Sequence, residues 1–125
     1  MSFDWSEYLN VAKELADVAN TSANKESKLR CAISRAYYAA FILARNYLRD
    51  REGLLIPITS DAHSFVSKQF DNSSDTARQS IGKKLQRLRR FRRQADYADF
   101  FPGLSGITQI ALKLSEEVIS TLSNL

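Results

Sequence analysis

The segment from Cys31 to Ala44 constrains the fold most, because it is apolar on nearly every side of a helix. Apart from its tyrosine hydroxyls, its only polar side chains are Ser34 and Arg35. A helix of this kind is either central in its bundle or buried by a second subunit. In a chain of only 125 residues we favour the second interpretation, a homodimer. The predicted interface lies opposite the main apolar face of the helix and comprises Cys31, Arg35, Tyr38 and Ile42.

Apolar residues recur at helical spacing along the rest of the chain, and glycine and proline cluster in the connections. We predict long helices over residues 4–19, 25–51 and 75–99, a short helix over 61–70, and a last long helix beyond Ser105. Asp4 and Glu7 have the spacing of a capping box at the start of the first helix. The pattern predicts an all-α fold, an up-and-down helical bundle of four long helices and one short helix. Residues 1–125 form its single domain.

The charge of the chain is concentrated in one of these helices. Residues 83–93 hold seven basic side chains and no acidic one, although the whole chain has a net charge of only +4. Such a surface either is simply hydrated or follows the phosphates of a nucleic acid. The absence of interleaved acids favours phosphate binding. The predicted RNA- or phosphate-binding residues are Lys83, Lys84, Arg87, Arg89, Arg90 and Arg93.

Arg92 differs from these residues because it falls within the apolar stripe of the same helix. It follows Leu88 by four residues and precedes Asp96 by four, which is the spacing of an ion pair. Two interpretations remain open. Arg92 and Asp96 form a structural pair at a helix seam, or Arg92 points into a cleft between subunits and stabilises charge that develops on a phosphate.

Other residue counts exclude several classes of site. Cys31 is the only cysteine and His63 the only histidine, so we predict no disulfide within the chain, no metal site and no cofactor. No apolar run is long enough to span a bilayer, and the N-terminus lacks the features of a signal peptide. We therefore expect no membrane association and a cytoplasmic location.

Two segments resemble the HEPN domain family (higher eukaryotes and prokaryotes nucleotide-binding). The first is AISRAYYAAF, residues 32–41, and the second is LRRFRRQADYAD, residues 88–99. The second resembles an Arg-x-x-Ala-Asp-Tyr signature, here formed by Arg92, Ala95, Asp96 and Tyr97. The resemblance implies a helical bundle that commonly dimerises, and often a metal-independent endoribonuclease of a toxin–antitoxin or defence system. It also implies a minimal nucleotidyltransferase as a possible partner protein.

The chain departs from the family's catalytic signature, which is an arginine with a histidine a few residues further on. The corresponding positions hold Tyr97, Ala98 and Asp99. Cleavage through the 2′-hydroxyl of RNA needs an acid and a base that titrate near neutral pH, whereas tyrosine titrates near about 10. The candidate catalytic residues are therefore Arg92, Asp96, which orients it, and Tyr97. His63 lies outside the signature and is interpreted as a capping or surface residue.

Two main functions compete on this evidence. The chain is a component of a toxin–antitoxin or defence module that acts on RNA, with Arg92 at a dimer cleft. Alternatively, it is a catalytically silent HEPN module that binds nucleotide or RNA, or docks a nucleotidyltransferase. A third, weaker possibility is a structural helical adaptor in which the basic run is incidental.

Overall fold

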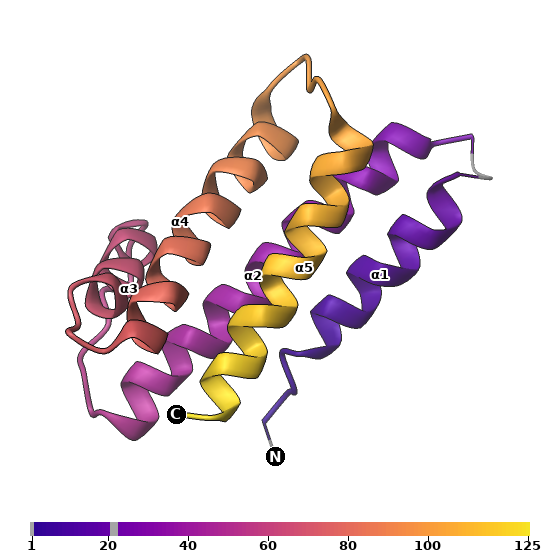
Figure 1. Cartoon of the computed structure of the whole chain (residues 1–125). Helices are drawn as coiled ribbons and strands as arrows, with labels where there is room; N and C mark the ends of the chain where they lie inside the picture. The colour runs from indigo at the N-terminus through magenta and orange to yellow at the C-terminus, as the bar shows by residue number, and fades with distance from the viewer. Residues whose placement is uncertain (1, 21–22) are drawn as a thin grey trace.

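The computed structural model describes residues 2–20 and 23–125, which form five helices and no strand. These are α1 (Glu7–Ala19), α2 (Lys25–Arg51), α3 (Asp61–Asp71), α4 (Thr76–Tyr97) and α5 (Leu104–Ser123). The four long helices run alternately up and down, and the short α3 lies outside the bundle beside α4 (Figure 1). The predicted all-α fold is confirmed.

The apolar helix α2 is the central helix of the bundle, since α1, α4 and α5 all pack against it. Its alanines Ala32, Ala36 and Ala39 meet the apolar face of α1. A buried hydrogen bond ties it to α5, where the Ser115 hydroxyl donates to the carbonyl oxygen of Ala36 at 2.7 Å. Most of the apolar surface of α2 is thus buried within one chain.

The helix ends differ from the prediction in several places, and α5 begins at Leu104, before its predicted start beyond Ser105. The first helix begins at Glu7 and has no capping box, because the Asp4 carboxylate accepts hydrogen bonds from the backbone N–H and hydroxyl of Ser6, at 3.0 and 2.7 Å. Helix α4 ends at Tyr97, two residues before the predicted end. Its start is capped by the Asp75 carboxylate, which accepts from the backbone N–H of Arg78 at 3.2 Å.

Helix α3 approaches α4 closely at Gly82. A Cβ atom at this position would lie 2.5 Å from the backbone nitrogen of Asp71 and 2.7 Å from the carbonyl oxygen of Ser67. Only glycine therefore permits this distance between the two helices.

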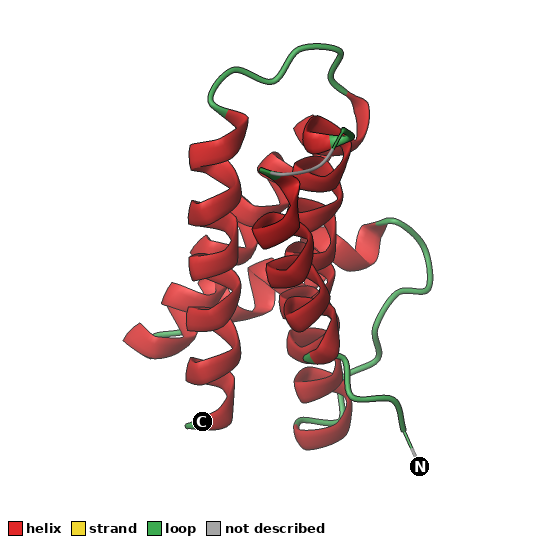
Figure 2. Ribbon diagram, turned by 90° about the vertical axis from the view of Figure 1, so that its right-hand side faces the viewer, coloured by secondary structure: helices red, strands yellow, loops and turns green. Residues whose placement is uncertain are grey.

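The second view shows α3 as a separate short element across the long helices (Figure 2).

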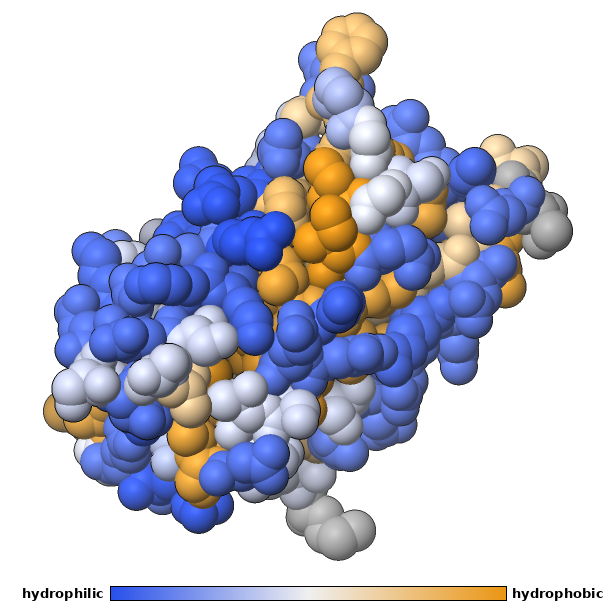
Figure 3. All heavy atoms as spheres, viewed as in Figure 1, coloured by the Kyte–Doolittle hydropathy of each residue, from blue (hydrophilic) through white to orange (hydrophobic). Residues whose placement is uncertain are grey.

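The surface over α3 and α4 is mainly hydrophilic, and hydrophobic residues gather in a strip along the middle of the same face (Figure 3). Within the described residues, no helix combines the length and the apolar character that crossing a membrane requires.

Candidate functional site

The side chain of Arg92 lies in the seam between α4 and α2. It is only 8% exposed, although it belongs to the most basic segment of the chain. Its guanidinium carbon lies 5.4 Å from the ring centre of Tyr37 and 5.6 Å from that of Tyr38, so the cation rests on two aromatic rings. Asp96 forms an ion pair with it at 3.5 Å, as the spacing predicts. The Nε atom of Arg92 is buried and has no hydrogen-bond partner.

His63, from the start of α3, reaches the same seam. Its Nδ1 atom is hydrogen-bonded to the Tyr37 hydroxyl at 2.5 Å, and its ring stacks on Phe41 with the ring centres 4.5 Å apart. It is half-buried. The interpretation of His63 as a capping or surface residue is therefore wrong. Its position agrees with the buried face of α3, because Val66 and Phe70 follow it at three and seven residues.

The surroundings of His63 keep its ring neutral. Burial, together with the smaller effect of the positive charges of Arg89 and Arg92, lowers its pKa to about 4. Burial raises the pKa of Tyr37, against the opposing effect of the same two arginines. At neutral pH an uncharged tyrosine and an uncharged histidine thus lie beside two cations.

Arg89 belongs to this site rather than to the outer surface of α4. It precedes Arg92 by three residues and so lies on a neighbouring part of the helix. Its Nε atom is also buried without a hydrogen-bond partner. Among the described residues, Arg89 makes no ion pair with a carboxylate within 4.0 Å. We call Tyr37, His63, Arg89 and Arg92 the arginine–histidine cluster.

A basic groove between α3 and α4 continues from this cluster. It has a volume of about 310 Å³, and no carboxylate lines it. Its cations are Arg89, Arg90 and Arg93 from α4 and Lys68 from α3. Lys68 was not among the predicted phosphate-binding residues, because it approaches the others only through the packing of α3 against α4.

The remaining predicted phosphate-binding residues lie apart from this groove. Lys83 pairs with Asp71 at 2.8 Å, and Lys84 lies 3.9 Å from a carboxylate oxygen of Glu117. The guanidinium of Arg87 lies 5.9 Å from the ring centre of Phe91. These three residues line a separate shallow hollow.

Tyr97 is not brought to the cluster. It is the last residue of α4 and is 76% exposed, whereas Arg92 is buried more than a turn earlier. The end of α4 is held by Arg30 of α2, whose Nη1 donates to the carbonyl oxygens of Ala95 and Ala98 at 3.0 and 2.6 Å. A cation at these free carbonyls satisfies the end of the helix and opposes its dipole.

The four predicted interface residues have different surroundings in the single chain. Cys31 is exposed. Arg35 is half-buried, with its guanidinium carbon 4.9 Å from the ring centre of Tyr8. Tyr38 is half-buried beside Arg92. Ile42 is part of the core at 8% exposed and offers little surface to another subunit.

Among residues 2–20 and 23–125, no group of three or more histidine, cysteine or acidic side chains is placed to hold a metal ion. The arginine–histidine cluster offers two cations, a neutral ring nitrogen and a phenol, and this combination suits an anion such as a phosphate.

A family model described as HEPN domain matches residues 5–125 of the chain. No curated protein matches, and no solved structure does.

Proposed function

The chain belongs to the HEPN domain family, and from this premise we propose that it binds RNA as a component of a toxin–antitoxin or defence module. The observation that carries the proposal is the incompletely neutralised positive charge of the arginine–histidine cluster, in which Arg92 pairs with Asp96 and Arg89 has no ion pair among the described residues. Arg89 and Arg92 each have a buried Nε without a partner. A buried donor without a hydrogen bond is costly, and the guanidinium groups that carry these donors are suited to binding a phosphate.

The basic groove supports RNA rather than an isolated phosphate as the ligand. Arg89 is shared between the cluster and the groove, and Lys68, Arg90 and Arg93 extend the positive surface beyond it. One phosphate at the cluster would thus be followed by others along the groove. Contacts of this kind give an affinity that does not depend on the RNA sequence and decreases as the salt concentration rises.

Binding of a fluorescent single-stranded RNA, measured by anisotropy at several salt concentrations, tests the proposal. Arg89→Gln and Arg93→Gln should weaken binding, and each should reduce the slope of log affinity against log salt by about 0.7. Arg51→Gln is the matched control, because Arg51 is exposed at the far end of α2 and lies outside the groove. Equal affinities for the two groove variants and the control would contradict the proposal.

A second candidate function, metal-independent RNA cleavage, is favoured by the position of His63. The signature histidine is absent from α4, but α3 supplies a histidine beside the signature arginine. A phosphate bound at Arg89 and Arg92 would raise the pKa of His63 from about 4 toward the range in which histidine transfers protons. His63 would then act on the 2′-hydroxyl or the leaving 5′-oxygen while Arg92 stabilises the charged phosphate.

Incubation of labelled RNA with the protein in the presence of a chelator separates this candidate from simple binding. Cleavage should disappear in Arg92→Ala and in His63→Ala, and it should persist in Tyr97→Phe, whose hydroxyl faces solvent. Protein that binds RNA and never cuts it would leave the chain a catalytically silent HEPN module.

We also propose a homodimer across the α2 surface that carries Cys31, Arg35 and Tyr38. Support comes from the proximity of Tyr38 to Arg92, which would place the two clusters of a dimer near the shared seam. We propose a minimal nucleotidyltransferase partner from the family resemblance alone, and the cytoplasmic location remains a proposal from the sequence. A neighbouring gene for a small nucleotidyltransferase would support the former.

A further inference from the structure

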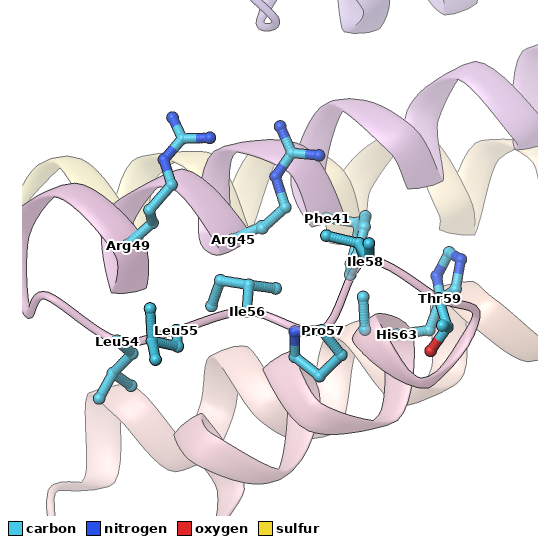
Figure 4. A pocket seen from close by; sticks show the side chains of 11 residues that line it. Phe41, Arg45, Arg49, Leu54, Leu55, Ile56, Pro57, Ile58, Thr59 and His63 are labelled. Carbon is cyan, nitrogen blue, oxygen red and sulfur yellow. The ribbon is translucent and has the colours of Figure 1, made fainter.

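A hollow lies between α2 and the connection formed by residues 54–59 (Figure 4). Its volume is about 580 Å³. Arg45 and Arg49 of α2 form one side, and the connection forms the other. His63 also lines it, so the hollow adjoins the arginine–histidine cluster. No residue of this hollow other than His63 is used in the proposed RNA contacts.

The connection presents apolar side chains to solvent at the rim of the hollow. Leu55 is 93% exposed and Ile58 is 101% exposed. Two large aliphatic side chains left this open within four residues form an unusual concentration of apolar surface on a small protein. Together they form a surface that could bind a flat apolar group.

The opposite side of the hollow carries positive charge that is only partly compensated. The guanidinium of Arg45 donates to the side-chain oxygen of Asn46 at 3.1 and 3.0 Å, which is a neutral partner. Within the described chain, Arg45 has no carboxylate within 4.0 Å. Arg49 pairs with its neighbour Asp50 at 2.8 Å. Burial and the charge of Arg49 lower the pKa of Arg45, so a further anion beside it would be favourable.

A hollow with an apolar rim on one side and a cation on the other matches a nucleotide, which has a flat base and an anionic phosphate. We propose that this hollow binds one unpaired nucleotide of the RNA, with the base against Leu55 and Ile58 and the phosphate on Arg45. The inference rests on the proposed RNA binding, because His63 connects the hollow to the cluster where the adjoining phosphate would lie. It adds a preference for single strands, since the bases of a duplex are stacked and paired and cannot enter.

Anisotropy with matched single-stranded and duplex RNA tests this subsite in the full chain. Arg45→Gln should reduce the salt slope for single-stranded RNA by about 0.7. Ile58→Ser should weaken single-stranded binding about fivefold or more, because the apolar surface that the base and Ile58 bury together would be lost. Both variants should leave duplex binding unchanged. Ile58 is fully exposed, so its replacement leaves the core intact. Arg51→Gln, on the same helix but outside the hollow, is the control and should match the wild type.

The outcomes separate this inference from the proposed function. If single-stranded and duplex RNA bind alike, and Arg45→Gln behaves as Arg51→Gln does, the subsite is overturned while RNA binding stands. If no RNA binds, the proposed function fails, and an NMR titration of the chain with uridine 5′-monophosphate decides the subsite. Shifts confined to the amides of residues 54–59 and their neighbours on α2 would support it, and unchanged spectra would overturn it.

Discussion

Replacement of Gly82 by alanine tests the contact that places α3, and with it His63, against α4. The new Cβ would lie 2.5 Å from the backbone nitrogen of Asp71 and 2.8 Å from its Cα. Both atoms belong to the backbone of α3, so no side chain can rotate away. The helices must move apart by several tenths of an ångström or more.

The expected effect is a loss of stability of about 2 kcal/mol. Forcing an extra carbon into a well-packed contact costs up to about 3 kcal/mol. Alanine is favoured over glycine in a helix by about 1 kcal/mol, which offsets part of this cost. Gly106→Ala is the matched control, because it changes the same residue type in α5 and its Cβ would meet nothing within 4 Å. It should be neutral or stabilising by up to about 1 kcal/mol.

Urea denaturation followed by far-UV circular dichroism measures both variants. The two should differ by about 2–3 kcal/mol in unfolding free energy, from the sum of the values above. His63 is the only histidine, so its NMR signals report its pKa without ambiguity. In Gly82→Ala that pKa should rise from about 4 toward 6.5, because α3 is displaced. If Gly82→Ala is as stable as Gly106→Ala and His63 titrates as before, the close approach of α3 to α4 is refuted.

Three further predictions concern stability and assembly. Because the pKa of His63 is lowered from 6.5 to about 4, the unfolded chain binds a proton that the folded chain does not as pH falls through this interval. Unfolding free energy should decrease by about 1 kcal/mol from pH 6.5 to about 4.5, after allowance for solvent screening, and His63→Gln should remove this loss. Arg30→Ala should lower the unfolding free energy by about 2 kcal/mol, measured by thermal or urea denaturation, because the carbonyls at the end of α4 lose their hydrogen bonds. Arg93→Ala, at an exposed position, should change the unfolding free energy little, and an equal loss in both variants would argue against capping of α4 by Arg30. Sedimentation at micromolar concentration should give twice the mass of one chain, with Tyr38→Asp shifting the protein toward the monomer; a monomeric wild type would contradict the dimer.

Most of the fold could be predicted because each helix carries its own periodic pattern and its own ends. The observed bounds of α2, Lys25 and Arg51, agree with the predicted ones. Polar residues before Lys25 and Gly53 after Arg51 interrupt the helical pattern there. Sequence alone could not choose between a central helix and a dimer helix. The pattern of Ala36, Ala39 and Ala40 is the same whether the helices that cover it are α1 and α5 of the same chain or belong to a second chain.

The candidate site was predictable only where it depends on one helix. The inward position of Arg92 follows from its spacing to Leu88 and Ala95, and the observed burial of its side chain confirms this position. Arg89 was predicted to bind phosphate with the other basic residues of the helix, and the burial of its Nε atom depends on packing that the helix pattern does not show. His63 is separated from Arg92 along the chain, so no spacing rule relates them. Its place at three and seven residues before Val66 and Phe70 was the available signal.

The arginine–histidine cluster depends on contacts at both ends of α4. Arg30 binds the carbonyls just beyond Arg92, and Gly82 permits the contact with α3 ten residues before it. These contacts fix α4 against α2 and α3 independently of the charges in the cluster. Two arginines can therefore remain near each other and near a neutral histidine without a carboxylate that neutralises them fully. The cost of that arrangement is met by packing elsewhere in the helix, which would leave the positive charge free for the phosphate that we propose.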